Sequence, residues 1–324
     1  MNLAEAIEFN ARSRPRKVAL VSDAGELTYE ELARRLSRAH ARLLKLGLTE
    51  GMLVGVCLKD TIEHVILIYA LARAGMVMMP MDCRWSIEEQ QRLASHFHPD
   101  AMIVEAGTEP LQAMRCIEVA AVMAEDETGP APPPADRDGL PLLLSLSSGT
   151  TGRPKGPRIT HHNMLRRFWT HWINLGLNSN SRYISATPLY FGGGRTFAMS
   201  VLHSGGTLIL FPPPFKVEAL CDAVARHRAT STFLVPTQLR RLLELPDERL
   251  RPLHRLELLI SSGAPLFSQE RQSVREKVSP NLFEYYASTE GGGVSLSSPE
   301  DQSLYPDSVG RAVFAVEIEI VGDD

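Results

Sequence analysis

Apolar residues recur along the chain with two spacings, one typical of helices and the other of short buried strands. Leu32, Leu36 and Leu43 fall on one face of a helix, and Thr28 with Glu31 has the spacing of a capping box at its start. The sequence therefore predicts an amphipathic helix that begins just after residue 28 and buries one stripe in a core.

Runs of apolar residues predict the strands. They fall at 52–58, 75–80, 183–188, 207–211, 231–235, 256–260 and 281–286. Helical patterns lie between several of these runs, among them 62–74, a helix capped by Ser86 and Glu89, and 217–228. Strands that alternate with helices favour an α/β fold in which a mostly parallel sheet is covered by helices.

Two stretches depart from this alternation. Residues 124–141 are rich in proline and charge, which predicts a surface connection between α/β lobes of about 1–140 and 141–300. In 313–321, apolar residues alternate with Glu317 and Glu319, the pattern of a half-exposed antiparallel strand. We expect residues 301–324 to begin a β-rich, barrel-like subdomain.

Composition narrows the class of protein. Of the 324 residues, 44% are hydrophobic and 22% are charged, which provides a core and excludes a wholly disordered chain. The formal charge of −4 disfavours nucleic acid as a partner. The four cysteines lack the paired spacing of a zinc site and are interpreted as reduced, structural thiols.

Neither a secretory signal nor a membrane span is expected. The amino terminus carries scattered charges where a signal would need an unbroken apolar segment. The most apolar stretch, 65–81, contains Arg73 and is shorter than the roughly 20 residues of a span. These features predict a soluble cytoplasmic protein.

The loop "SSGTTGRPKG" at 147–156 has two interpretations, a flexible linker or a cradle for phosphate. It follows the apolar run "LLLSL" and precedes a helical pattern at 160–175. Backbone N–H groups between a buried strand and a helix commonly hold phosphate, so the second interpretation is favoured. The pattern of a P-loop fails because Lys155 is followed by Gly156, where that motif needs Ser or Thr.

Residues 147–156 resemble the phosphate loop of the adenylate-forming superfamily, which includes acyl-CoA synthetases, nonribosomal-peptide adenylation domains and luciferases. The segments "THHN" at 160–163, "SSGAPL" at 261–266 and "YYASTE" at 285–290 extend the resemblance. It runs from about Leu27 to Gly310. It implies a layered αβαβα domain with two sheets, in which 1–324 is a truncated large N-terminal AMP-binding domain without the small C-terminal domain.

The resemblance implies a reaction in which ATP activates a carboxylic acid as an acyl adenylate, which then forms a thioester with CoA. Lys155, Thr289 and Glu290 would be catalytic, with Glu290 also binding Mg²⁺. The residues expected to contact the nucleotide are Ser147, Ser148, Gly149, Thr150, Thr151, Gly152, Lys155, Gly263, Ala264, Pro265, Glu284, Tyr285, Tyr286, Ala287 and Thr289.

The substrate is expected to be a fatty, aryl or other small organic acid. Amino-acid-activating relatives place an aspartate near 190, but no acidic residue occurs between Ser181 and Leu210. Arg195 is interpreted as a surface or inter-helix residue, with an extra acidic group on the substrate as its alternative partner. The expected walls of the substrate site are Tyr190, Phe191, Gly192, Gly193, Val235, Pro236 and Ser262.

Three alternatives remain open for the activity. The acyl group would pass either to CoA or to a carrier-protein thiol, and the third alternative is an inactive nucleotide-binding protein. Among partners, a second copy of the chain in a homodimer is also expected as an option. Phe191 occupies a position where acyl-CoA synthetases often have histidine, and Pro157 and Ala287 also depart from the family pattern. If residues 1–324 are the complete chain, these departures and the early end favour weak or no turnover, or an inactive nucleotide-binding protein.

Overall fold

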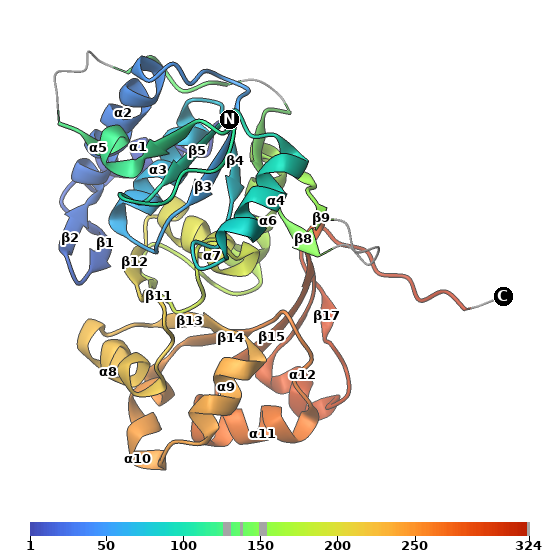
Figure 1. Ribbon diagram of the computed structural model, residues 1–324. Coiled ribbons are helices and arrows are strands. Elements are labelled where there is room, and N and C mark those ends of the chain that lie inside the picture. The colour runs from blue at the N-terminus through green and yellow to red at the C-terminus, as the bar shows by residue number, and fades with distance from the viewer. Residues whose placement is uncertain (126–130, 137–138, 149–153, 323–324) are drawn as a thin grey trace.

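The computed structural model describes residues 1–125, 131–136, 139–148 and 154–322 (Figure 1). Within them a nine-stranded sheet has the order β17-β16-β15-β14-β13-β11-β12-β1-β2. Its strands are β1 (Val18–Ser22), β2 (Gly25–Thr28), β11 (Arg182–Ser185), β12 (Thr207–Leu210), β13 (Ser231–Leu234), β14 (Leu258–Ser261), β15 (Leu282–Ser288), β16 (Gly292–Ser297) and β17 (Arg311–Ala312). The strands from β15 to β1 pair in parallel, and antiparallel strands close both edges.

A second, six-stranded sheet has the order β10-β7-β4-β3-β5-β6 among the described residues. Its strands are β3 (Leu53–Cys57), β4 (Val77–Pro80), β5 (Ala101–Val104), β6 (Cys116–Glu118), β7 (Pro141–Leu144) and β10 (Arg158–Thr160). Only the β7–β10 pair is antiparallel in this described sheet. The prediction of mostly parallel sheets is confirmed.

Helices form three layers around the two sheets (Figure 1). α4 (Ile87–Phe97) packs on the outer face of the six-stranded sheet, and α8 (Val217–His227), α9 (Pro236–Leu243) and α11 (Ser268–Lys277) pack beyond the nine-stranded sheet. The remaining helices are α1 (Glu5–Ser13), α2 (Tyr29–Lys45), α3 (Ile62–Arg73), α5 (Val119–Met123), α6 (His161–Ile173), α7 (Gly192–His203), α10 (Asp247–Leu250) and α12 (Pro299–Leu304), with a 3-10 turn, η1 (Arg251–Arg255). The layered αβαβα prediction is confirmed.

α3 and α7 are buried along most of their lengths because they are covered on both sides. α3 has buried residues on all of its faces, and the hydroxyl of Tyr69 donates to the carbonyl of Met199 on α7 at 3.1 Å. α2 begins as predicted, since Thr28 and Glu31 form a complete capping box. These contacts fix α7, whose first turn opens onto the candidate site.

The two sheets interleave along the sequence. β1 and β2, from residues 18–28, belong to the nine-stranded sheet, whereas β7 and β10, from residues 141–160, belong to the six-stranded sheet. The division of the chain into domains stays a prediction. Among the described residues, no helix combines the length and the apolar character that a membrane span requires.

The predicted strand at 313–321 is wrong. β17 ends at Ala312, and 313–322 follows without regular secondary structure. The side chains of Ile318 and Ile320 are 47% and 91% exposed, so the alternation does not separate a buried face from a solvated one. A strand needs backbone hydrogen bonds along its length. The N–H of Val313 donates to the carbonyl of Val294 in β16 at 3.1 Å, but no ladder between described strands continues beyond Ala312.

Candidate functional site

A cavity of about 520 Å³ lies where the carboxyl ends of strands from both sheets meet α6 and α7. Ligands of α/β proteins commonly bind at this end of the strands, since the loops that follow them converge there. The described residues that line it are Pro80, Trp85, Leu143, Ser145, Leu146, Met164, Arg167, His171, Tyr190, Phe191, Gly192, Gly193, Arg195, Thr196, Phe197, Phe233, Ser262, Gly263, Tyr285, Ala287, Ser288, Thr289, Gly292 and Gly293.

The cavity brings the residues just before the phosphate-loop motif beside the 287–289 segment, in which Ala287 and Thr289 are expected nucleotide contacts. Ser145 and Leu146, which lead into the phosphate-loop motif, line it together with Ala287 and Thr289. The motif's flanks form a short ribbon, in which Ser147 in β8 (Ser147–Ser148) pairs with Lys155 in β9 (Pro154–Lys155).

The centre of the motif lies outside the described residues, and Lys155 is exposed. The residues of the motif that the structure does not describe are Gly149, Thr150, Thr151 and Gly152. The phosphate contacts therefore stay a prediction.

Arg167 on α6 holds the turn that carries Thr289 and Glu290. Its Nη2 donates to the carbonyl oxygens of Thr289 at 2.8 Å and Glu290 at 2.7 Å. Burial lowers the pKa of the Arg167 guanidinium, which Tyr285 and Glu290 partly offset. The sequence analysis missed Arg167, because only the packing of α6 against β16 brings it to this turn.

The same turn depends on a glycine. Gly292 has φ +82°, and a Cβ there would lie 2.7 Å from Cγ of Arg167. A side chain at 292 would therefore both strain the backbone and displace the arginine. Glycine at this position and arginine on α6 form one arrangement.

Glu290 and Thr289 face neighbouring spaces. Thr289 lines the 520 Å³ cavity, whereas Glu290 lines an adjoining hollow of about 260 Å³ that shares Arg167 and Gly293 with it. Mg²⁺ is usually bound by one or two carboxylates together with phosphate oxygens and water, so an exposed glutamate beside this cavity fits such an ion when a nucleotide supplies the rest. No group of three or more His, Cys, Asp or Glu side chains among the described residues could hold a metal by itself.

Glu284 is buried and contacts other parts of the protein. Its carboxylate forms a 2.7 Å ion pair with Arg271 and accepts from the backbone N–H of Leu266 at 3.3 Å. Burial raises the pKa of Glu284, and the Arg271 charge opposes that shift. This pair supports the exposed segment with Ala264 and Pro265, which lies outside the cavity lining.

The two tyrosines of the "YYASTE" segment differ in environment. Tyr285 is buried, and its hydroxyl lies 2.9 Å from that of Thr170. Tyr286 is 57% exposed, which leaves its ring face available for stacking. Adenine contact by Tyr286 stays a prediction.

Most of the expected substrate walls converge. Tyr190, Phe191, Gly192, Gly193 and Ser262 line the cavity. The two remaining expected wall residues, Val235 and Pro236, are outside the lining, although a Cβ built on Gly263 would lie 3.7 Å from Cγ1 of Val235.

Arg195, interpreted from the sequence as a surface or inter-helix residue, is 1% exposed, so the surface part of that interpretation is wrong. Its Nη1 donates to the carbonyl oxygens of Leu189 at 3.0 Å and Tyr190 at 2.9 Å. The signal in the sequence was a lone arginine within the apolar helix that follows "FGGG". Whether such a residue points into a core or a cavity depends on packing that the sequence does not display.

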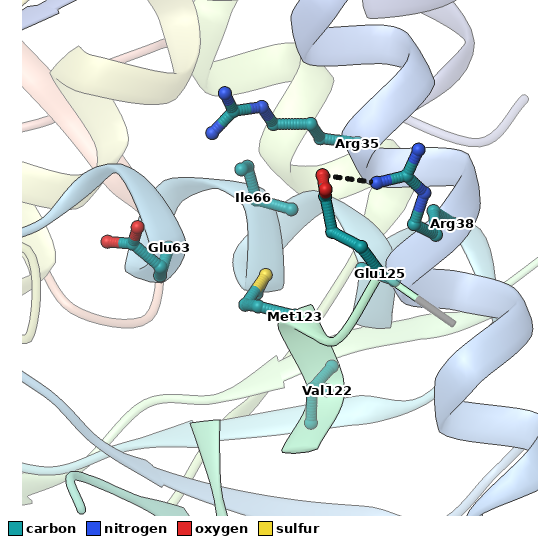
Figure 2. A pocket seen from close by; sticks show the side chains of 8 residues that line it. Arg35, Arg38, Glu63, Ile66, Val122, Met123 and Glu125 are labelled. Atoms are coloured by element: carbon teal, nitrogen blue, oxygen red, sulfur yellow. Dashed lines mark hydrogen bonds and ion pairs between the residues drawn. The ribbon is translucent and has the colours of Figure 1, made fainter. Parts of the chain in front are cut away.

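A third, much smaller hollow lies away from these residues, between α2, α3 and α5 (Figure 2). Its volume is about 50 Å³, close to that of one or two water molecules. Arg38 and Glu125 face each other across it and form a 2.7 Å ion pair. A hollow this small, whose charged residues Arg38 and Glu125 pair with each other, has no room for a nucleotide. The candidate site is therefore the larger cavity.

Comparison with known sequences agrees with this geometry. Residues 7–324 match the AMP-binding enzyme family. The chain is 28% identical to the 4-hydroxybenzoate--CoA/benzoate--CoA ligase of Rhodopseudomonas palustris, over 97% of this chain and 62% of the ligase. It is 26% identical to the indoleacetate--CoA ligase of Aromatoleum aromaticum, over 100% of this chain and 67% of that ligase. The chain thus spans 62% of the length of the first of these relatives.

Solved structures support the same fold. The chain resembles the O-succinylbenzoate coenzyme A synthetase (MenE) of Bacillus subtilis in complex with AMP, with TM-score 0.88 and 23% identity over 98% of this chain and 82% of that chain. It also resembles the N-terminal subdomain of NpsA from Klebsiella oxytoca, with TM-score 0.84 and 23% identity over 96% of this chain and 78% of that chain. At this identity the likeness shows the fold.

Proposed function

Because the chain belongs to the AMP-binding enzyme family, we propose that it activates a carboxylic acid with ATP and Mg²⁺ and passes the acyl group to the thiol of CoA. The relatives named above are ligases that join organic acids to CoA. The observation that carries the proposal is the shared cavity, which brings the approach to the phosphate-loop motif beside Thr289 and the expected substrate walls.

The chemistry proceeds in two balanced steps. A carboxylate oxygen attacks the α-phosphorus of ATP, the new oxygen–phosphorus bond forms, and the bond to the β-phosphate breaks to release pyrophosphate. The thiolate of CoA then attacks the acyl carbon, a thioester forms and AMP leaves. Alignment of the reactants and stabilisation of negative charge on phosphate are the main tasks of the protein.

The described residues divide these tasks by position. Thr289 lines the cavity and its hydroxyl would donate to the α-phosphate, while Arg167 keeps the turn in place. Tyr286 would stack on the adenine. A Mg²⁺ ion held by Glu290 would neutralise charge on the phosphate oxygens.

The direct test is pyrophosphate release over a panel of aliphatic and aryl carboxylic acids, with Mg·ATP and with or without CoA. We expect release with at least one acid, and consumption of CoA in step with it. The Thr289→Val variant keeps the shape of the side chain and removes the hydroxyl, so its rate should fall about 100-fold. Absence of pyrophosphate with every acid, while Mg·ATP still binds, would contradict the proposal.

The same assay separates the two acceptors. Pyrophosphate release without any CoA consumption supports delivery to a carrier-protein thiol, the alternative that the resemblance leaves open. A cytoplasmic location and a homodimer remain predictions from the sequence.

A further inference from the structure

Arg195 is a buried cation that has no carboxylate partner among the residues the structure describes. Its Nε is buried and makes no hydrogen bond with any described residue, whereas Nη1 donates to the two backbone carbonyls of Leu189 and Tyr190. Burial, followed by the nearby Arg167 charge, lowers the pKa of the guanidinium to about 10, so Arg195 is still protonated at neutral pH. A buried charge that only neutral dipoles stabilise is costly, which calls for a reason to keep it.

The two arginines that line the cavity differ in their surroundings. Arg167 lies within the electrostatic influence of Glu290 and holds the Thr289 turn. No acidic side chain contributes to the pKa shift of Arg195. The two arginines also lie on different walls of the cavity. Arg195 is on α7 and contacts the loop before it, whereas Arg167 is on α6 and contacts the turn between β15 and β16.

The cavity favours an anion with an apolar body. Among its described lining residues there are two arginines and no aspartate or glutamate. The first turn of α7 has no side-chain cap, and Gly192 and Gly193 bring its backbone to the lining. Aromatic rings from several elements complete the walls, namely Trp85, Tyr190, Phe191, Phe197 and Phe233.

We propose that Arg195 is a specificity-determining residue that binds a second carboxylate of the acid substrate, apart from the carboxylate that reacts with ATP. The inference rests on the proposed function and names its substrate class, a dicarboxylic acid with an apolar, ring-sized body. A guanidinium forms charge-assisted hydrogen bonds with a carboxylate, and Arg195 is a charged residue in the cavity lining whose Nε has no hydrogen-bond partner among the described residues. Binding of the substrate would thereby provide a counter-ion that none of the described residues supplies.

The test compares dicarboxylic acids with isosteric acids that carry one charge. The probes are phthalate, isophthalate, terephthalate and adipate, each beside its mono-amide, so that only the second charge differs. Affinity for each acid is measured by calorimetry on the 1–324 chain, and pyrophosphate release is measured in parallel. We expect at least one dicarboxylate to bind ten or more times tighter than its mono-amide.

Two substitutions remove that preference by different amounts. In Arg195→Met the dicarboxylate and its mono-amide should bind within twofold of each other, and Arg195→Lys should keep part of the preference because it keeps the charge. Arg84→Met is the matched control. The Nη2 of Arg84 donates to the hydroxyl of Tyr190 at 2.7 Å, but Arg84 is already paired with Asp82. The preference for the dicarboxylate over its mono-amide should therefore persist in Arg84→Met.

If Arg195→Met does not fold, Arg195→Lys still tests the inference. Thermal unfolding of each variant shows whether it is folded. A purely structural arginine that braces residues 189–190 would lower both affinities together and leave their ratio unchanged. That result, or equal affinities for every pair in the unsubstituted protein, overturns the inference. Weaker binding of Mg·ATP with an unchanged ratio also overturns it and assigns Arg195 to the nucleotide.

The proposed function fails separately. If the dicarboxylate preference collapses in Arg195→Met but no acid releases pyrophosphate, the anion subsite stands and the adenylation activity does not. If no probe acid binds but another acid of the panel releases pyrophosphate, the anion subsite is contradicted and the adenylation activity stands.

Discussion

The guanidinium of Arg167 donates to the carbonyl oxygen of Thr289 at 2.8 Å and so ties α6 to the turn that follows β15. The phosphate-loop motif immediately precedes α6 along the chain, since β10 and Thr160 lead into that helix. One helix therefore connects the two segments that were assigned to the nucleotide, and the position of Thr289 depends on it.

Arg167→Met is expected to lower the rate of pyrophosphate release about 100-fold, because displacement of a reacting group by about 1 Å has an effect of that size. Global stability should fall by no more than about 2 kcal/mol, since the residue is only partly buried. The measurement is the rate of pyrophosphate formation at saturating Mg·ATP. Arg166→Met is the control, because Arg166 is exposed on the same helix. Equal losses in the two variants would show that the Thr289 contact has no special role.

Glu290→Gln is expected to raise the Mg²⁺ concentration for half-maximal pyrophosphate release at least tenfold. An amide oxygen is a neutral and weaker ligand for this hard cation than a carboxylate. The side chain is exposed, so the unfolding free energy should change by less than about 0.5 kcal/mol. Titration of Mg²⁺ at fixed ATP measures the effect, with Glu319→Gln in the exposed carboxyl-terminal segment as the matched variant. An unchanged Mg²⁺ requirement would remove Glu290 from the metal site.

The elements of the fold could be predicted because each depends on local signals. The Thr28 and Glu31 capping box and the alternation of buried runs with helical patterns depend on residues close in sequence, and the structure reproduces both. The pattern at 313–321 misled because alternation describes what a strand would bury, not whether a neighbouring strand is present to pair with it.

The site was less accessible to prediction. The motifs at 147–156 and 285–290 indicate the class of chemistry, but Arg167 and Arg195 acquire meaning only from what the fold places beside them. Both are arginines within amphipathic or apolar helices, where a solvated side chain is the ordinary interpretation. Their burial results from contacts across more than one hundred residues for Arg167 and from the loop before α7 for Arg195.

The three glycines that open α7 are expected to differ sharply in their tolerance of alanine. A Cβ on Gly194 would lie 2.4 Å from the carbonyl oxygen of Thr187, whereas a Cβ on Gly192 would meet nothing within 4 Å. Gly193 is intermediate, with Phe233 Cε1 at 2.8 Å. Gly194→Ala should therefore destabilise by about 3 kcal/mol and Gly193→Ala by about 1 kcal/mol. Gly192→Ala should be neutral or stabilise by about 0.5 kcal/mol, since alanine favours helix.

Urea denaturation of the three variants provides the measurement, and Gly192→Ala serves as the internal control for the other two. Equal destabilisation at all three positions would contradict the close approach of α7 to the carbonyls of the 187–188 loop.

Buried histidines are expected to make the protein unstable in acid. Burial lowers the pKa from 6.5 to about 4 in four of them, His40, His64, His161 and His203. It lowers the pKa of His171 to about 3. The unfolded chain binds these protons first, so the stabilisation is complete above pH 6.5 and is lost as the pH falls toward 4. Each histidine contributes about 1.4 kcal/mol per pH unit in that window.

Asp60 acts in the opposite direction, because burial raises its pKa to about 6 and the folded state then binds its proton first as the pH falls. Glu284, whose pKa burial also raises, acts in the same direction as Asp60. Two carboxyls cannot offset five imidazoles, and total stabilities are only about 5–15 kcal/mol. Unfolding near pH 5 is therefore expected, measured as the unfolding free energy in urea at several values between pH 7.5 and 5.0. His203 packs against the rings of Phe168 and Trp172, so phenylalanine fits the same surroundings. His203→Phe should therefore reduce the dependence of the unfolding free energy on pH by about 1.4 kcal/mol per pH unit. A slope that is the same in both proteins would mean that His203 is protonated equally in the folded and unfolded chains.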